Sequence, residues 1–506
     1  MNSNDAVFFD CIITNKNTTM DTKALRQKIL DLAIHGKLVP QDPNDEPASV
    51  LLERIKAEKE RLIKEGKIKR SKKSAKSSDT PHYENVPFEL PNSWVWCRLE
   101  DIAYVASGST PDKTCFVENG VPYIKMYNLR NQKIDFAYHP QYITEEVHNG
   151  KLQRSRTEVG DLIMNIVGPP LGKLAIIPTT LPQANFNQAA VLIRPYKFKE
   201  VLVSYLKVYL EEMSEINSIA TRGSAGQVNI SLTQSQNMRI PIPPLNEVRR
   251  IIEEVSKYDI LIDSLKQNIT DIQNLIAYTK SKILDLAIHG KLVPQDPNDE
   301  PAIELLKRIN PDFTPCDNGH YTFDVPSGWI TTNLGSIFNV VSAKRILKSD
   351  WKHSGVPFYR AREIAKLSIY GLVDNELYIS EEHYNSLKEK FPVPKASDIM
   401  ISAVGTIGKC YIVKESDKFY YKDASVLCLC NDYQINAKYI YHIMRSEYML
   451  KQMYDNSKGT TVDTITIEKA KQYILPLPPL AEQQRIVAKI EETFSIFDGI
   501  QNSLEA

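Results

Sequence analysis

Apolar or near-apolar residues recur at steps of three and four along a long stretch that begins after Pro244. The positions are Val248, Ile251, Val255, Tyr258, Ile262, Leu265, Ile269, Ile272, Ile276, Thr279, Ile283 and Leu286. Over roughly five heptads this spacing predicts a coiled-coil helix, about 60 Å long at 1.5 Å per residue. Gly290 and Pro294 predict its end, because glycine favours the position just past a helix and proline cannot continue one.

A second copy of this helix is predicted to be split between the two ends of the chain. The pattern returns after Pro479, at Ile486, Ile490, Thr493, Phe497, Ile500 and Leu504, and the sequence stops at Ala506. Leu25, Ile29 and Leu32 match the remaining positions of the first helix. We therefore expect the two ends to lie close together, with the split helix packed antiparallel on the unbroken one.

The chain also repeats outside the helices. The segment KILDLAIHGKLVPQDPNDEPA occupies residues 28–48 and, letter for letter, residues 282–302. At a shift of about 235, LPNSWVW resembles VPSGWIT, VPYIKMYNLR resembles VPFYRAREIA, GDLIMNIVG resembles SDIMISAVG, and IPIPPLNEVRRII resembles LPLPPLAEQQRIV. Such self-similarity indicates two copies of one unit.

Each unit contains a stretch of short β-branched or alternating runs, such as VPYIKMY, DLIMNIV and AAVLIRP, with glycine and proline between them. Short helices fit VSYLKVYLEEMSEI and AKYIYHIMRSEYML. The prediction is an α+β fold: two mixed domains with irregular sheets and function carried on loops, separated by long helices in a pseudo-two-fold circular repeat.

These patterns divide the chain into seven parts. They are an extension outside the repeat (1–19), the N-terminal part of the split helical region (20–55), a basic linker (56–84), a first mixed domain (85–244), a central helical region (245–310), a second mixed domain (311–479) and the C-terminal part of the split region (480–506). The extension is either a poorly packed tail or the product of an upstream start codon, with Met20 as the start. The linker is either solvated chain or a DNA backbone contact.

Composition narrows the functional classes. The 62 basic and 62 acidic residues cancel, which excludes a histone-like protein held on nucleic acid by bulk charge but leaves local patches open. No apolar run approaches the roughly 18 residues that a membrane span needs. The seven cysteines are scattered without a CxxC pair, and Cys428 and Cys430 lie in a strand-like run. We expect reduced thiols and no metal site.

Catalytic signatures are missing from the sequence. It has no GxxxxGK[ST] phosphate loop, and no Asn-Pro-Pro-aromatic or Asp-Pro-Pro-aromatic motif, since GPPLGK carries a glycine at the required amide or acid. His35 and His289 each precede a helix-ending glycine, which favours a helix cap over a general base. We predict no catalytic residue in this chain.

Polar residues in matched loops of the two mixed domains are candidates for reading bases, because Arg and Lys suit guanine while Asn and Gln suit adenine. For any single one, a surface ion pair or a turn is the alternative, and the matched placement is the evidence. The candidates are Thr110, Lys113, Lys125, Asn128, Arg130, Arg222, Gln227 and Asn229 in the first domain, and Lys344, Arg345, Arg360, Arg362, Lys458, Thr460 and Thr461 in the second.

From residue 20 onward, the heptad helix, the twin segments and the twin PIPPLNEVRRI and PLPPLAEQQRI runs resemble the specificity subunit of type I restriction–modification enzymes. The resemblance implies two target-recognition domains, each reading one half of a bipartite site in double-stranded DNA, and an antiparallel coiled coil that sets the gap. It implies two modification subunits, which use S-adenosylmethionine to methylate adenine, and two translocase–nuclease subunits, which use ATP and Mg²⁺. This chain would bind no cofactor itself and would act in the cytoplasm of a prokaryote.

The twin segments would then stay identical because both face the same partner. The docking candidates are His35, Lys37, Gln41, Asp42, His289, Lys291, Gln295 and Asp296. Recent sequence exchange between the copies is the alternative explanation. Two rival functions remain at this point: a single-chain restriction–methylation enzyme, and a structural spacer whose domains bind protein.

Overall fold

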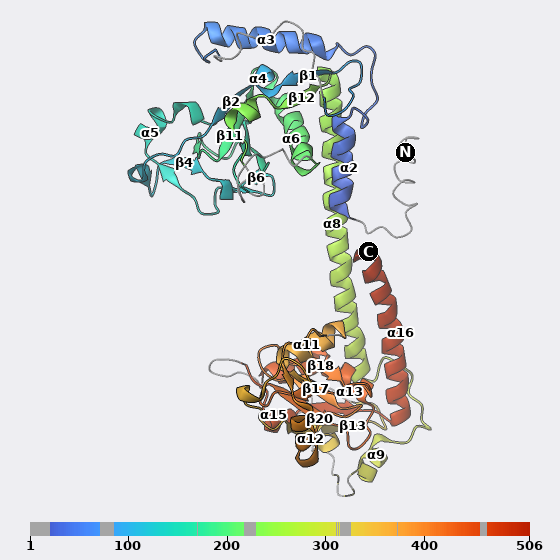
Figure 1. The fold of residues 1–506 in the computed structure, drawn as a ribbon. Helices are drawn as coiled ribbons and strands as arrows, with labels where there is room; N and C mark the ends of the chain where they lie inside the picture. The colour runs from blue at the N-terminus through green and yellow to red at the C-terminus, as the bar shows by residue number, and fades with distance from the viewer. Residues whose placement is uncertain are drawn as a thin grey trace. The chain divides into compact units, whose positions relative to one another are not determined.

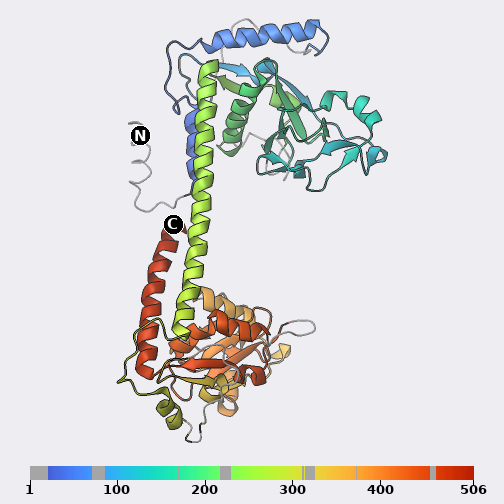
Figure 2. The same ribbon diagram turned by 180° about the vertical axis from the view of Figure 1, so that it is seen from behind.

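The computed structural model describes residues 21–70, 86–168, 171–216, 229–309, 311, 313, 325–371, 373–455 and 463–505, with the backbone alone for 213–216 and 505. The chain forms two compact units, residues 1–268 and 269–506, shown in Figures 1 and 2. Helix α8 (Leu245–Ile288) contributes its first part to unit 1 and its last part to unit 2. No described helix is long and apolar enough to cross a membrane.

Each unit is built on a four-stranded antiparallel sheet of the same strand order. In unit 1 the order is β2 (Ala103–Ser107), β11 (Ala190–Pro195), β8 (Leu162–Asn165) and β9 (Leu174–Ile176). In unit 2 it is β14 (Asn339–Ser342), β20 (Val426–Cys430), β17 (Ile399–Ser402) and β18 (Cys410–Ile412). The two central strands of each sheet are almost wholly buried, as their apolar runs predict, and the predicted strands at DLIMNIV and AAVLIRP are confirmed.

A smaller mixed sheet lies beside each of these. Unit 1 orders it β10 (Asn185–Phe186), β4 (Val121–Ile124), β7 (Tyr142–Ile143) and β3 (Phe116–Val117), with a separate β5 (Leu129–Arg130) and β6 (Lys133–Ile134) pair. Unit 2 orders it β16 (Tyr378–Ile379), β15 (Val356–Tyr359) and β19 (Tyr420–Tyr421).

A two-stranded ladder brings the start and the end of each domain together. Strand β1 (Val95–Arg98) pairs with β12 (Arg239–Ile242), and β13 (Ile330–Asn333) pairs with β21 (Ile474–Leu477). Both ladders are antiparallel and in the same register after the shift of 235, which confirms the predicted duplication.

Short helices fill the edges of the domains. In unit 1 they are α4 (Leu99–Ile102), α5 (Glu145–Asn149), α6 (Lys199–Ile216) and α7 (Leu232–Gln236). In unit 2 they are α9 (Ala302–Ile309), α10 (Leu334–Ile337), α11 (Ala361–Tyr370), α12 (Glu381–Lys390), α13 (Ala437–Met444), α14 (Glu447–Asp455) and α15 (Ile467–Lys471). The helices predicted at VSYLKVYLEEMSEI and AKYIYHIMRSEYML correspond to α6 and to the α13–α14 pair.

The split helix packs on α8 within each unit, as both views show. In unit 1, α2 (Thr22–Ile34) buries Ile29 and Ala33 in one core with Val248 and Ile251 of α8. In unit 2, α16 (Leu480–Glu505) shares a core with the end of α8. Both pairings are antiparallel, because residues later in one segment bond to residues earlier in the other. In unit 1, Arg26 bonds Asp259 and Asp45 bonds Arg250. In unit 2, Lys280 bonds Asp498 and Asp299 bonds Arg485. The predicted closeness of the two chain ends stays a prediction.

Two predictions about the helices were wrong in detail. The heptad spacing predicts Ile272 and Leu286 on the buried seam, but they are 39% and 40% exposed, while Leu284 and Ala287 are buried. The end of α8 packs against the domain core as well as α16, which rotates and widens its buried stripe. The stretch expected to be linker from residue 56 is helical up to Lys64, since α3 (Ala48–Lys64) continues through it. Arg61 pairs with Glu58 and Glu65 one turn away on either side, which favours the helix.

Identical turns end α2 and α8. Gly36 and Gly290 have left-handed φ values of 66° and 64°, and the amide after each donates to the carbonyl of Leu32 or Leu286 at 2.9 Å. A side chain would also collide with the mixed domain, since an added Cβ would lie 2.6 Å from Pro91 Cγ in unit 1. The predicted helix end at Gly290 is confirmed, and the turn seats the twin segment against its domain.

A buried glutamate ties each twin segment to the first turn of a long helix. Glu482 accepts from Gln295 Nε2 at 2.6 Å and from Trp329 Nε1 at 2.8 Å. In unit 1, Glu247 accepts from Gln41 in the same way. Both glutamates are 1% exposed, and a negative side chain suits a helix N-terminus. We call these contacts the glutamate clamps.

Ion pairs flank both glutamate clamps. Asp45 pairs with Arg250 and Asp299 with Arg485, each at 2.6 Å, with the aspartates almost buried. Gln41 and Asp45 therefore bond to α8, and their copies Gln295 and Asp299 bond to α16 in the same arrangement. Burial raises the pKa of Glu247 and of Glu482 above the usual value, even though hydrogen bonds and a nearby arginine act in the opposite direction.

We predict that Glu482→Gln changes how stability depends on pH. A carboxyl whose pKa is raised by folding binds more protons in the folded state than in the unfolded state. Its contribution to the free energy of unfolding is therefore favourable near the ordinary pKa of about 4.3, and that contribution is lost as pH rises toward neutrality. The thermal midpoint of the wild type, relative to Glu482→Gln, should therefore rise as pH falls from about 7 to about 5.

Glu300→Gln is the matched control for this pH series. Arg308 hydrogen-bonds the exposed Glu300 and lowers its pKa, so the wild type should lose stability relative to that variant as pH falls. Parallel pH profiles for the wild type and Glu482→Gln would contradict the role assigned to the buried carboxylate.

Candidate nucleic-acid interface

Equivalent strands of the two domains lead into different surface elements (Figure 1). Strand β4 continues through the short turn Met126–Asn128 into the β5–β6 hairpin, whereas β15 continues into helix α11. Both elements begin with the same backbone box. The Lys125 amide donates to Asn128 Oδ1, and the Arg360 amide donates to Glu363 Oε2, both at 2.9 Å. The two domains thus present a hairpin and a helix at the same place on a common frame.

Asn128 is a positioning residue of this frame. It is fully buried, and its amide nitrogen donates to the carbonyls of Asp135 at 3.2 Å and Tyr138 at 2.8 Å. With its carbonyl oxygen bonded to Lys125, no polar atom of the side chain is left to face a base. The burial of Asn128 argues against the predicted base contact. The residue type alone could not show this, because an exposed asparagine and an asparagine that holds a loop are the same in the sequence.

Arg130 lies on the surface of the hairpin, as a base or phosphate contact requires. Its guanidinium stacks 4.0 Å from the Tyr138 ring centroid and lies 3.6 Å from Asp135. Stacking of this kind holds an arginine fork in one orientation before it meets a ligand.

The remaining described first-domain candidates lie at the end of β4, in the loop between β2 and β3, and beside the end of β8. Lys125 Nζ lies 5.4 Å from the ring of Phe116, and Tyr123 donates to the Ser109 carbonyl at 2.9 Å, which fixes the loop carrying Thr110 and Lys113. Thr110, Lys113 and Asn229 are exposed. Asn229 forms a backbone bridge to Val167.

Two second-domain candidates belong to an ion-pair network. Arg360 makes two bonds to the buried Glu363, and Arg362 bonds Glu363 and the exposed Glu376. Burial would raise the pKa of Glu363, but the hydrogen bonds from Arg360 and Arg362 keep it below the usual value. Arg360 is therefore committed to the frame, while the side chain of Arg362 remains about half exposed.

Lys344 and Arg345 are both exposed on the loop that follows β14. Lys344 Nζ lies 5.7 Å from the centroid of the Phe391 ring, and the backbone amide of Lys344 donates to the Tyr420 hydroxyl oxygen at 3.0 Å. The other candidates lie outside the described residues: Arg222, Gln227, Lys458, Thr460 and Thr461.

Most predicted docking residues are engaged within the chain. His35 and His289 lie at the helix ends, each with Nδ1 2.7 Å from the carbonyl four residues earlier, in line with the predicted capping role. Gln41 and Gln295 donate to the carbonyls of the turn glycines, as well as to the clamp glutamates. Asp42 and Asp296 accept from the amide two residues later at 2.9 Å. Lys37 and Lys291 are exposed and have no partner in the described part of the chain.

Several exposed residues on the hairpin and on α11 were missed. They are Asn131 and Lys133 on the hairpin, and Lys366, Ile369 and Tyr370 on the helix. The hairpin turn is Asn131-Gln132, with φ values of 49° and 56°. The usual sequence signal for such a turn is Asn-Gly, and glycine is absent here.

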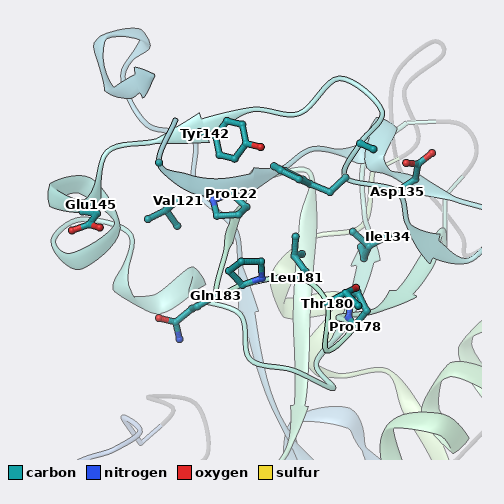
Figure 3. Close-up of a pocket in the computed structure, with 14 residues that line it drawn as sticks. Val121, Pro122, Ile134, Asp135, Tyr142, Glu145, Pro178, Thr180, Leu181 and Gln183 are labelled. Atoms are coloured by element: carbon teal, nitrogen blue, oxygen red, sulfur yellow. The ribbon is translucent and has the colours of Figure 1, made fainter. Parts of the chain in front are cut away.

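The first domain also contains a cavity of about 640 Å³ behind the hairpin (Figure 3). Val121, Pro122 and Leu181 form apolar walls, and Asp135 and Glu145 place carboxylates at its edge. None of the predicted DNA contacts that the structure describes lines this cavity, and the carboxylates make it unsuited to phosphate.

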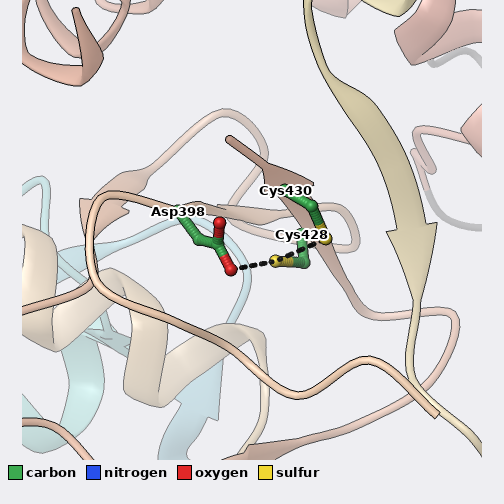
Figure 4. A group of neighbouring side chains, drawn as sticks. All are labelled: Asp398, Cys428 and Cys430. Atoms are coloured by element: carbon green, nitrogen blue, oxygen red, sulfur yellow. Dashed lines mark hydrogen bonds between the residues drawn. The ribbon is translucent and has the colours of Figure 1, made fainter. Parts of the chain in front are cut away.

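A buried group in the second domain combines Asp398, Cys428 and Cys430 (Figure 4). Cys428 Sγ lies 3.8 Å from both Asp398 Oδ2 and Cys430 Sγ. Asp398 accepts the amides of Lys395 and Asn431, both at 2.8 Å, and the equivalent Asp161 of the first domain likewise accepts a backbone amide. The carboxylate thus has the same turn-holding role in both domains, and the thiols belong to the core of the sheet.

Comparisons with known proteins agree with this duplicated architecture. A family model described as the type I restriction modification DNA specificity domain matches twice, at residues 91–274 and 326–506. The chain is 29% identical to the type I restriction enzyme EcoAI specificity subunit of Escherichia coli, over 93% of this chain and 88% of that protein. It is 28% identical to the EcoEI specificity subunit of the same organism, over 96% and 91%.

A solved structure also shares the fold. Its title is "Structural basis underlying complex assembly and conformational transition of the type I R-M system", and it superimposes with a TM-score of 0.52 at 19% identity, over 83% of this chain and 94% of that chain. The two family matches begin near the first strand of each mixed domain and together span most of the sequence. This chain therefore belongs to the type I restriction modification DNA specificity family.

Proposed function

We propose that this chain is the DNA specificity subunit of a type I restriction–modification complex. The observation that carries the proposal is the double match to the specificity-domain model, on two units with the same sheet order and the same ladder register. Each domain reads one half of a bipartite site in double-stranded DNA. The helix α8, with α2 and α16 packed on it, sets the gap between the halves.

The division of labour follows from what differs between the units. The sheets and glutamate clamps are repeated, whereas the β5–β6 hairpin and α11 are different elements at equivalent positions. Two readers of one shared sequence would have no reason to diverge there. Two readers of different half-sites need different polar surfaces, because each base pair presents its own pattern of donors and acceptors.

Chemistry in this proposal belongs to partner subunits. Two modification subunits bring S-adenosylmethionine and methylate adenine, and two restriction subunits use ATP and Mg²⁺. The chain contributes recognition and no catalytic group, in keeping with the missing motifs for phosphate and amine binding. The complex would act in the cytoplasm, where its DNA is.

The test is a base-resolution map of methylated adenine in cells that carry the modification subunit, with and without this gene. We expect methylation at one gapped, two-part motif that disappears when the gene is removed. Re-expression of the gene should restore the same motif, as a control for secondary mutations. A map that is identical in the presence and absence of the gene would contradict the proposal.

Docking of the modification subunits is proposed for the exposed part of the twin segments. Gln41, Asp42 and their copies already bond within the chain, whereas Lys37 and Lys291 are the predicted docking residues whose charged groups have no partner among the described residues. Each lies on a turn of identical sequence and geometry, as one partner bound in two copies requires.

We predict that the double variant Lys37→Glu, Lys291→Glu loses at least about tenfold in affinity for the modification subunit, since it reverses one exposed charge at each proposed interface. Titration calorimetry on the purified subunits measures the loss. The control, Lys64→Glu with Lys388→Glu, reverses one exposed charge per unit on α3 and α12 and should bind normally. Equal affinity of both double variants would remove these lysines from the interface.

A further inference from the structure

We propose that the β5–β6 hairpin and helix α11 are the elements that enter the major groove, one in each half-site. This inference rests on the proposed function and assigns it to particular residues. The major groove of B-DNA is about 12 Å wide and admits either a two-stranded ribbon or an α-helix. The two domains carry one of each, at equivalent points after β4 and β15.

The hairpin has a rigid, polar tip. Asn131 is exposed and has no partner among the described residues, whereas Gln132 Oε1 accepts the Leu174 amide at 2.7 Å and fastens the turn to β9. Positive φ values at both positions form the tight turn. Asn131 therefore projects from a fixed backbone, and an asparagine can make paired hydrogen bonds to adenine.

Two cations flank this tip. Arg130 and Lys133 face each other across the β5–β6 ladder, and both are exposed. The stacked, pre-oriented guanidinium of Arg130 suits the two acceptors of guanine, and a mobile lysine suits phosphate. The buried Asn128 holds the hairpin from behind, so the reading residues need little ordering on binding.

Helix α11 presents a comparable face in the second domain. Ile364 and Leu367 are buried against the sheet, while Arg362, Lys366 and Tyr370 are exposed at steps of four on the opposite side. Ile369 and Tyr370 are neighbours at the end of the helix and are 59% and 72% exposed, so α11 presents apolar surface next to Lys366. Apolar groups of this kind can contact the thymine methyl in the groove, and Lys366 can bond a base or a phosphate.

The ends of α11 are fixed as firmly as the hairpin. Its first turn is held by Glu363, which is 1% exposed and bonded by both Arg360 and Arg362. Gly371, with φ of 68°, ends the helix directly after Tyr370. The exposed face is thus carried on a rigid element, which a base reader requires.

The test uses the assembled methyltransferase complex with Asn131→Ala in the first domain, and Lys366→Ala and Tyr370→Ala in the second. Binding is measured against a library in which each base pair of the wild-type motif is varied in turn. We expect each variant to lose about tenfold or more of its discrimination at one or two base pairs. Asn131→Ala should affect one half-site only, and both α11 variants should affect the other.

Matched controls are Asn119→Ala and Lys388→Ala, which remove exposed polar side chains from other turns and helices of the same domains. Thermal unfolding measurements check that every variant is folded. The inference would be overturned if the base preferences of the variants stayed within about twofold of the controls at every base pair. It would also be overturned if a variant bound all sequences more weakly by the same factor, because that indicates phosphate contact alone. The absence of any two-part motif for the wild type would instead overturn the proposed function itself.

Discussion

The fold depends on a buried carboxylate at the first turn of each long helix. Glu247 and Glu482 are placed where the helix N-terminus favours negative charge, and each is met by a glutamine from the preceding helix–turn segment. Burying an unpaired carboxylate is costly, so a substitution that removes the glutamine destabilises the fold unless the glutamate is replaced as well. These polar contacts hold the turn of each twin segment on its helix, beside the apolar core that joins each mixed domain to its helix pair.

This constraint explains much of the identity between the twin segments. Gln41, Asp42 and Asp45 are polar, yet each has a partner in the chain, and the second copy repeats every bond. Glycine at position 36 is required both by its left-handed φ and by the close approach of Pro91. Internal bonding thus explains why these polar positions are the same in both copies, without requiring that they contact a partner.

The sequence predicted the helical frame well because its signals are local and periodic. The heptads of α8, the split helix and the glycine after α8 follow from apolar spacing and backbone preference, and the matched strands follow from the repeat. The burial of Leu284 in place of Leu286 could not be predicted, since it depends on where the domain core meets α8.

Site residues were harder to predict because residue type does not reveal exposure. Asn128 and Arg360 have the chemistry of base readers, but one holds a loop and the other an ion pair with a buried glutamate. Asn131 and Tyr370 were overlooked because the hairpin lacks a glycine turn and because α11 has no counterpart in the first domain. The useful signal was the divergence between two aligned runs, VPYIKMYNLR and VPFYRAREIA, rather than any single letter in them.

The central claim is that two interchangeable domains read DNA independently from a duplicated frame. The most direct measurement replaces residues 91–242 with a second copy of residues 326–477, whose end strands are in the same register, and maps methylated adenine in cells. The account predicts a gapped motif in which the bases of one wild-type half now appear in both halves. A methylated motif that keeps two different halves would contradict the account, because the base specificity of the first domain would then not depend on residues 91–242.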